Sequence, residues 1–171
     1  MQTSDRICMM RLEKIRACSM ETIVLKFGGA SVATPAHFAQ IASIIVQRNE
    51  EANIVVVVSA MGDTTNQLLA LSKEVHPSPP PRELDMLVSV GERISISLLA
   101  MALSLKGKEA ISFTGSQSGI ITSSLHTGAL VLDVRPRRIL EALSQNKIVI
   151  VAGFQGGEST WRDYDVGKRW F

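Results

Sequence analysis

A lysine and two glycines stand together near the start of the chain, in the segment Lys26–Gly29. Lys26 is the last residue but one of the apolar run Thr22–Phe27, and the two glycines follow this run directly. Glycines let the backbone approach an anion closely, exposed N–H groups can point at phosphate oxygens, and the lysine adds a positive charge. The segment therefore indicates phosphate binding. A two-glycine turn after a strand is also common for structural reasons, and the sequence matches neither GxxxxGK[ST] nor GxGxxG.

Two further segments could bind a small polar substrate. Ser59–Thr65, with the sequence SAMGDTT, follows a second apolar run and carries hydroxyl groups at an expected helix start, where Asp63 or Thr64 could instead be an N-cap. The segment Gly91–Ser95, GERIS, places Glu92 at another expected helix start. Its carboxylate could receive a substrate ammonium group, or simply interact favourably with the helix dipole.

Two segments rich in glycine and small polar residues follow two more apolar runs. They are Phe113–Ser124 and Ala152–Thr160. Both are expected to be ligand loops. The three histidines, His37, His76 and His126, show no spacing with Cys, Asp or Glu that is typical of a metal site, so they are interpreted as surface or loop residues and no metal ligand is assigned.

Four apolar runs rich in valine and isoleucine predict the strands that position these loops. Unbroken runs such as IVVVV are typical of parallel strands covered on both faces. Ligands of such sheets bind outside the carboxyl ends of the strands, where the segments above lie. The predicted strands are Thr22–Phe27, Asn53–Ser59, Glu109–Thr114 and Lys147–Ala152.

Helical patterns separate the predicted strands. Thr34 can cap a helix with Pro35 at its first position, and a second amphipathic helix surrounds Ile139. Glu92–Leu105 is apolar nearly all round, which predicts a helix packed between other elements. The proline-rich stretch His76–Pro81 is expected to join two helices. Alternating strands and helices predict an α/β sandwich with a mainly parallel sheet.

The composition argues against nucleic-acid-binding, disulfide-rich and membrane-spanning proteins. The 171 residues are 46% apolar and 20% charged, and 18 basic against 16 acidic residues leave a charge of +2, too balanced for a nucleic-acid partner. Cys8 and Cys18 both precede the first strand, which excludes a disulfide-dense fold and favours the cytoplasm. The longest strongly apolar helical run has 12 residues, against roughly 20 for a bilayer span, so no membrane segment is expected.

Five ordered motifs closely resemble those of the aspartokinases. This resemblance covers residues 22–163 and corresponds to the amino-terminal part of the catalytic domain. It implies a three-layer αβα amino-acid-kinase fold, present incompletely. The motifs are KFGGASV at Lys26–Val32, VVVVSAMGDTTNQLL at Val55–Leu69, ELDMLVSVGERIS at Glu83–Ser95, FTGSQSGI at Phe113–Ile120 and VAGFQG at Val151–Gly156.

The resemblance implies ATP-dependent phosphorylation of the side-chain carboxylate of L-aspartate, which gives 4-phospho-L-aspartate for lysine, threonine and methionine biosynthesis. Lys26, Phe27, Gly28 and Gly29 would contact ATP, and Lys26 would be the catalytic lysine, neutralising charge on the transferring phosphoryl group. Mg²⁺ is expected with the nucleotide. Ala30 replaces the Thr or Ser of the family, with the loss of one hydroxyl group.

The resemblance also implies an amino-acid site. Thr65 and Glu92 would bind the aspartate, with Ser59 nearby. Two alternatives stay open: another amino-acid kinase of the acetylglutamate type, and a non-catalytic partner of an intact kinase subunit, in a homo- or hetero-oligomer.

The two ends of the chain depart from the family. Residues 1–19 are expected to be a frayed arm or to precede a true start at Met20, and residues 20–163 a partial domain. After Arg162 and Asp163 the family continues into a TTLGRGGSD-like motif, whereas residues 164–171 read YDVGKRWF. If the coding sequence of this octapeptide is read one nucleotide later, its codons can spell Thr-Thr-Leu-Gly, then Lys or Arg, then Gly-Gly-Ser. We therefore hypothesise a frameshift. The chain alone is expected to be inactive and to expose sheet edges.

Overall fold

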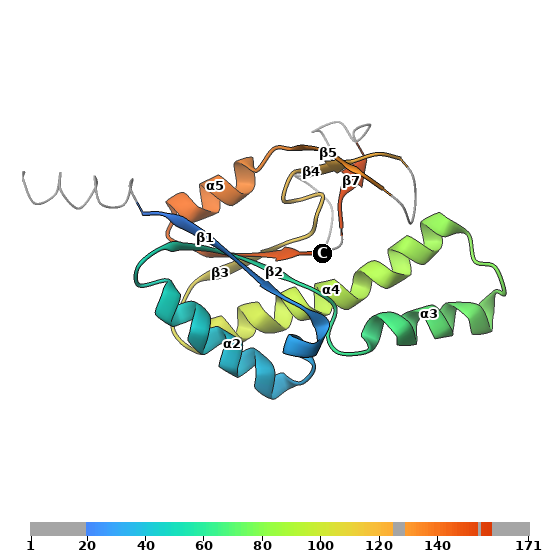
Figure 1. Cartoon of the computed structure of the whole chain (residues 1–171), viewed down its shortest axis with the longest axis horizontal. Helices are drawn as coiled ribbons and strands as arrows, with labels where there is room; N and C mark the ends of the chain where they lie inside the picture. The colour runs from blue at the N-terminus through green and yellow to red at the C-terminus, as the bar shows by residue number, and fades with distance from the viewer. Residues whose placement is uncertain (1–19, 125–128, 154, 159–171) are drawn as a thin grey trace, which may run out of the picture.

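The computed structural model describes residues 20–124, 129–153 and 155–158, so the predicted arm 1–19 and the tail 164–171 lie outside the described residues. Figure 1 shows the arrangement of the elements. In chain order these are β1 (Thr22–Phe27), the 3₁₀ helix η1 (Gly29–Val32), α2 (Pro35–Arg48), β2 (Asn53–Val58), α3 (Thr64–Val75), α4 (Pro81–Ser104), β3 (Ala110–Phe113), β4 (Ile120–Thr122), β5 (Val131–Val134), α5 (Arg137–Ser144), β6 (Ile148–Ala152) and β7 (Gly157–Glu158).

The main sheet has four parallel strands in the order β1-β2-β6-β3. All four predicted strands are confirmed, with ends that differ by one residue at most. Val55 of β2 pairs with Val24 of β1 on one side and with Val149 of β6 on the other. Because the strands are parallel, their carboxyl ends share one edge, which we call the carboxyl edge.

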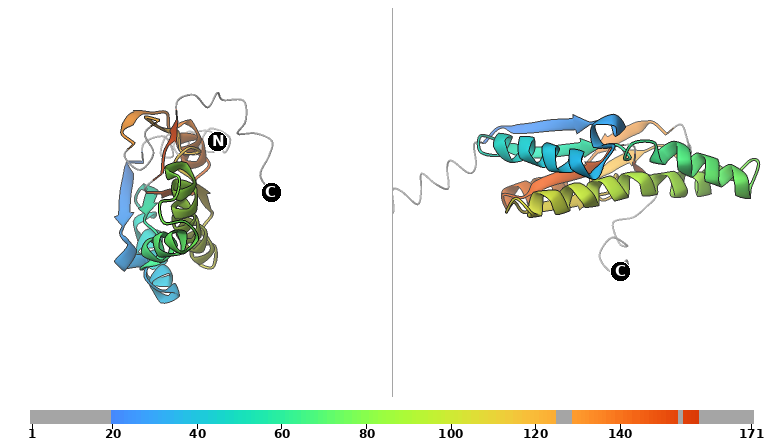
Figure 2. Two further views of the ribbon diagram at one scale, coloured as in Figure 1. Left: turned by 90° about the vertical axis from the view of Figure 1, so that its right-hand side faces the viewer. Right: turned by 90° about the horizontal axis from the view of Figure 1, so that it is seen from below.

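Helices cover both faces of this sheet, so the predicted three-layer αβα sandwich is confirmed (Figures 1 and 2). On one face, α2 and α4 lie side by side and pack against β2 and β6. The core between them includes Ile45, Ile54 and Leu99. On the other face α5 packs with Leu143 against Val149. Burying branched apolar side chains on both faces is what stabilises a parallel sheet.

The expectation that every strand is covered on both faces is wrong for β1. Its residues alternate between exposed and half-buried. Ile23, Leu25 and Phe27 pack on the core formed with α2 and α4, whereas Val24 is 63% exposed. The reason is that β1 is an edge strand and α5 packs over β3 and β6, so that the α5 face of β1 is left uncovered.

The helix α2 starts as predicted. Thr34 is its N-cap residue and Pro35 its first residue, and the Thr34 N–H donates a hydrogen bond to His37 Nδ1 at 3.2 Å. Its apolar side chains at helical spacing, among them Phe38 and Ile41, are buried against the sheet. His37 is therefore part of a helix start and not of a loop.

The stretch His76–Pro81 joins two helices as expected, because α3 ends at Val75 and α4 begins at Pro81. The helix α4 therefore starts well before Glu92, where the sequence placed a helix start. Of the helices in the described residues, α4 alone is long and apolar enough to cross a bilayer by length and composition, which is weak evidence for a membrane span. It packs against α2, α3, β3 and β6. It is not enclosed all round, because Ile94 and Met101 are 41% and 65% exposed.

A second sheet, in the order β5-β4-β7, was not predicted. It lies beside the main sheet near the carboxyl edge (Figure 1). Gly119 precedes β4 with φ +81° and leaves no room for a side chain, because a Cβ atom there would meet the Arg135 carbonyl oxygen at 2.0 Å.

In β5, a hydrogen bond from the Arg135 guanidinium and a second from the Val134 N–H lower the pKa of Asp133.

Candidate functional site

The loops after β1 and β2 are joined to one another at the carboxyl edge. The Ser59 N–H donates to the Phe27 carbonyl oxygen at 3.1 Å, and the Gly62 N–H donates to the Gly29 carbonyl oxygen at 3.1 Å. The lysine–glycine segment and the SAMGDTT segment, which are separate in sequence, thus form one surface.

The two glycines of the first loop have different roles. A Cβ atom on Gly29 would lie 3.0 Å from the Ala60 carbonyl oxygen and 3.2 Å from that of Gly62, so close packing of the two loops accounts for this glycine. A Cβ atom on Gly28 would have no neighbour within 4 Å. Packing therefore gives no reason for glycine at position 28, whereas an open backbone is what close approach of a phosphate requires.

Lys26 is exposed near the end of β1 and lies on the α5 face of the sheet, since it alternates with the half-buried Leu25 and Phe27. Its partner in register is Val57 of β2. The loop after β6 reaches the same place, because a Cβ atom on Gly153 would lie 3.0 Å from Val57 Cγ1, and the Gly153 N–H donates to the Val58 carbonyl oxygen at 3.0 Å. Lys26 thus lies close to the point where the loops after β1, β2 and β6 meet.

The SAMGDTT segment turns into α3, but not by the predicted capping. Asp63 occupies the N-cap position, yet within the described chain its carboxylate accepts a hydrogen bond from Asn66 Nδ2 and caps no backbone N–H. The Thr64 hydroxyl donates to the Met61 carbonyl oxygen at 2.6 Å, also not a capping bond. Ser59 and Thr65 are half-buried beside this turn.

Glu92 lies near the middle of α4 and is only 5% exposed. The alternative of a favourable interaction with the helix dipole is therefore wrong, because that effect is confined to the first turn. The preceding residue, Gly91, brings α4 onto the SAMGDTT turn: a Cβ atom there would lie 2.9 Å from the Ala60 Cβ atom and 3.4 Å from Thr64 Cγ2. Glycine at position 91 thus places Glu92 next to this turn.

The loops after β3 and β6 complete the carboxyl edge. A Cβ atom on Gly115 would lie 1.8 Å from the Gln155 carbonyl oxygen, so the two loops touch through their backbones. The Gln155 side-chain amide donates to the Ser89 carbonyl oxygen of α4 at 2.8 Å. Sequence reasoning placed Gln155 within a ligand loop but assigned it no role, since nothing in the sequence connects it with Ser89.

The structure therefore brings most of the predicted residues together but on two faces. The joined loops after β1 and β2 include or adjoin Phe27, Gly28, Gly29, Ser59 and Thr65. Glu92 comes from α4, on one face of the sheet, whereas Lys26 lies on the face that α5 covers in part. A lysine and open backbone can bind phosphate, while a buried carboxylate can bind an ammonium group. Among residues 20–124, 129–153 and 155–158, no cluster of three or more His, Cys, Asp or Glu side chains could hold a metal ion.

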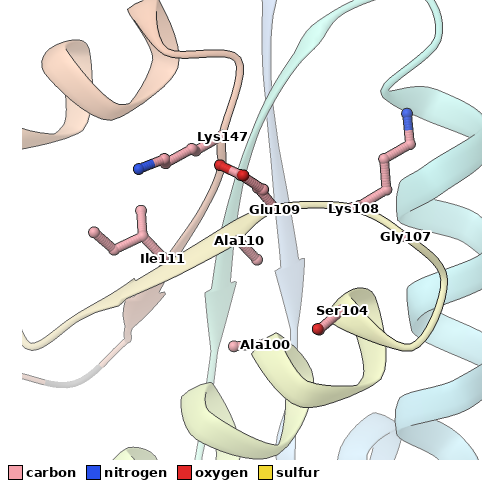
Figure 3. Close-up of a pocket in the computed structure, with 8 residues that line it drawn as sticks. All are labelled: Ala100, Ser104, Gly107, Lys108, Glu109, Ala110, Ile111 and Lys147. Atoms are coloured by element: carbon pink, nitrogen blue, oxygen red, sulfur yellow. The ribbon is translucent and has the colours of Figure 1, made fainter.

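A groove of about 440 Å³ lies at the other end of the strands and contains none of these residues. Figure 3 shows that its lining comes from the end of α4 and from the starts of β3 and β6. Its polar side chains are Ser104, Lys108, Glu109 and Lys147. This groove is distinct from the candidate site.

The chain is similar in sequence to curated aspartokinases. The chain is 50% identical to an aspartokinase of Mycolicibacterium smegmatis over 145 residues, which are 84% of this chain and 34% of that protein. It is 48% identical to an aspartokinase of Bacillus sp. strain MGA3, over 80% of this chain and 34% of that one. The chain thus spans about a third of the length of these curated relatives.

Solved structures share the fold. Aspartate kinase from Synechocystis superposes with a TM-score of 0.67 at 41% identity, over 79% of this chain and 22% of that chain. Aspartokinase III of E. coli, in complex with aspartate and ADP, has a TM-score of 0.71 at 22% identity, over 81% and 42% of the two chains. The model of the amino acid kinase family matches residues 21–162. This chain therefore belongs to the amino acid kinase family.

Proposed function

We propose that the chain forms the first part of the catalytic domain of an aspartokinase, residues 20–163, which transfers the γ-phosphoryl group of ATP to the side-chain carboxylate of L-aspartate. The observation that carries the proposal is the meeting of Gly29, the SAMGDTT turn and Glu92 at one edge of the sheet. The identity of 50% with a named aspartokinase supports the choice of substrate.

The nucleotide would lie over the loop after β1. Gly28 leaves its backbone open on the surface, and Lys26 extends beside it as an exposed cation. Phosphoryl transfer depends mainly on positioning and on electrostatic stabilisation of the transferring group. Lys26 would supply that positive charge, while Phe27 and Gly29 hold the loop against the core and against Ala60.

The amino acid would lie beside α4. The buried Glu92 carboxylate would bind the ammonium group of aspartate, and the hydroxyl groups of Thr65 and Ser59 would bind its carboxylates. A charged group in a site shielded from water binds an opposite charge more strongly than an exposed one does. The described residues offer no cluster for Mg²⁺, so the ion is proposed only as the counter-ion of the ATP phosphates and is assigned no protein ligand.

The test is a titration of the 171-residue chain followed by ¹⁵N NMR. We expect L-aspartate to shift the amide signals of Thr65 and Arg93, which adjoin the amino-acid site, and N-acetyl-L-glutamate to leave them in place. A response to N-acetyl-L-glutamate alone would assign the chain to a different amino-acid kinase. A response to neither would refute the proposed site. Cytoplasmic location and assembly as a homo- or hetero-oligomer belong to the same proposal, whereas a non-catalytic partner of an intact kinase subunit is the alternative.

A further inference from the structure

Gln155 connects two parts of the candidate site that are 66 residues apart in sequence. Its side-chain Nε2 donates to the main-chain carbonyl oxygen of Ser89 at 2.8 Å, in a partly buried position. This bond links the loop after β6 directly to α4.

The acceptor belongs to the helical turn that carries Glu92. In an α-helix the Ser89 carbonyl oxygen accepts from the N–H of Arg93, the residue after Glu92. A carbonyl oxygen has two lone pairs, so it can accept from Gln155 as well. The bond from Gln155 thus acts on the backbone immediately around Glu92.

The donor is itself firmly placed. The backbone of Gly115 lies against the Gln155 carbonyl oxygen so closely that no side chain fits between them. Nearer the strand, the Gly153 N–H is bonded to the Val58 carbonyl oxygen. Gly153 is therefore held by β2, and the Gln155 backbone lies against the loop after β3.

The same turn of α4 is held from a second direction by Gly91, which packs on Ala60 and Thr64. Packing at Gly91 fixes how closely this turn of α4 approaches the SAMGDTT turn, within the wider packing of the helix against α2, α3, β3 and β6. The hydrogen bond to Ser89 adds a directional contact from the loop after β6 at the same turn.

We infer that Gln155 is a positioning residue for amino-acid binding, which holds the α4 turn so that the Glu92 carboxylate faces the acceptor site. The inference rests on the proposed function, because it takes Glu92 to bind the substrate. Gln155 acts through the Ser89 carbonyl group and does not itself contact the reacting atoms.

The first test needs no ligand. Gln155→Met keeps the length of the side chain but removes the donor, and Gln155→Glu offers only acceptors at neutral pH. Ser89→Ala is the matched control, because it removes a hydroxyl group bonded to the Met86 carbonyl oxygen and keeps the main-chain acceptor. We expect both Gln155 variants to shift the ¹³C signal of the Glu92 carboxylate and to speed amide exchange at Arg93, with Ser89→Ala matching the parent chain. Unchanged signals in Gln155→Met would overturn the inference.

The second test measures substrate binding. We expect Gln155→Met to weaken L-aspartate binding at least fivefold, to leave the affinity for an ATP analogue unchanged, and Gln155→Lys, which restores a donor, to recover much of the loss. Equal loss of both affinities would indicate a general structural role and overturn the inference. If Gln155→Met does not fold, the comparison of Gln155→Lys with Gln155→Glu decides. If the parent chain binds no aspartate, the proposed function fails, while the ligand-free test still decides whether Gln155 positions Glu92.

Discussion

Gly29 lies so close to Ala60 that a Cβ atom on the glycine would stand 3.0 Å from the Ala60 carbonyl oxygen. Gly29→Ala should therefore push the two loops apart and lower the free energy of unfolding by about 1–3 kcal/mol, the usual cost of overpacking. Urea denaturation followed by circular dichroism measures this. A Gly29→Ala variant as stable as the parent chain would show that the loops adjust without cost.

The neighbouring glycine is the matched comparison. Gly28→Ala places its methyl group in open space, at a φ of −78° that alanine adopts readily, so stability should stay within about 0.5 kcal/mol. Binding of a fluorescent ATP analogue should nevertheless weaken, since the methyl group would stand where phosphate is proposed to approach. Unchanged nucleotide affinity would argue that Gly28 is not part of a phosphate site.

Lys26 should matter for nucleotide binding and not for folding. Its side chain is exposed, so Lys26→Met should leave the unfolding midpoint nearly unchanged. A hydrogen bond to a charged group contributes about 1.5–3 kcal/mol, which predicts a loss of about tenfold or more in affinity for the ATP analogue. Lys108→Met, in the groove at the far end of the strands, is the control and should bind as the parent does. Equal losses in both variants would mean non-specific attraction of the nucleotide.

Gly91 should be required for the approach of α4 to the SAMGDTT turn. Alanine stabilises a helix interior by about 1 kcal/mol relative to glycine, but here its methyl group would lie 2.9 Å from the Ala60 Cβ atom. We expect Gly91→Ala to lower stability by about 1 kcal/mol net, because overpacking outweighs the helix preference.

Ala60→Gly tests the cause of that loss. Removing the opposing methyl group should make Gly91→Ala less harmful, with a coupling energy of about 0.5–3 kcal/mol in a double-mutant cycle. Additive effects of the two substitutions would place the cause elsewhere in the helix.

Glu92 should determine amino-acid affinity. Removing one partner of a buried charge pair costs about 2–5 kcal/mol, so Glu92→Gln should weaken L-aspartate binding by roughly 30-fold or more. Glu83→Gln, an exposed carboxylate on the same helix, is the control and should leave the affinity unchanged. Isothermal titration calorimetry compares the two, after circular dichroism shows that both variants are folded. Unaltered aspartate binding by Glu92→Gln would remove Glu92 from the site.

Asp133 offers a pH-dependent prediction in the second sheet. The hydrogen bonds from Arg135 and Val134 lower the pKa of Asp133 below its ordinary value of 3.8. A lowered pKa stabilises the fold above that ordinary value, and the contribution is lost as the pH falls through the folded-state pKa. Arg135→Gln should raise the pKa of Asp133 towards 3.8 in a ¹³C NMR titration. The same pKa in both proteins would contradict a role for Arg135.

The strands of the main sheet could be predicted from the sequence, because short unbroken apolar runs rich in valine and isoleucine leave few alternatives to a buried strand. The second sheet was missed because β4, β5 and β7 have only two to four residues each, too few to set up a recognisable strand pattern. The start of α4 was also placed too late, because Glu83 and Asp85 interrupt the apolar pattern that elsewhere indicates a helix.

The sequence names residues for the candidate site but does not predict how they are arranged. Motif resemblance singles out Lys26, Glu92 and Thr65, yet their placement on two faces of the sheet depends on strand alternation and on the close contact at Gly91. The role inferred for Gln155 depends on a contact across 66 residues. Local patterns carry no information about contacts of this kind.

The strand order has a consequence for the time at which the fold can form. β6 is the fourth strand of the main sheet along the chain, yet it lies between β2 and β3. Until residue 152 has been synthesised, β2 and β3 cannot be joined, and each presents an unpaired edge to its surroundings. A nascent chain leaving the ribosome would keep the valine-rich edge of β2 and the edge of β3 open until β6 is made, so early synthesis is the stage at which a chaperone would be of most use.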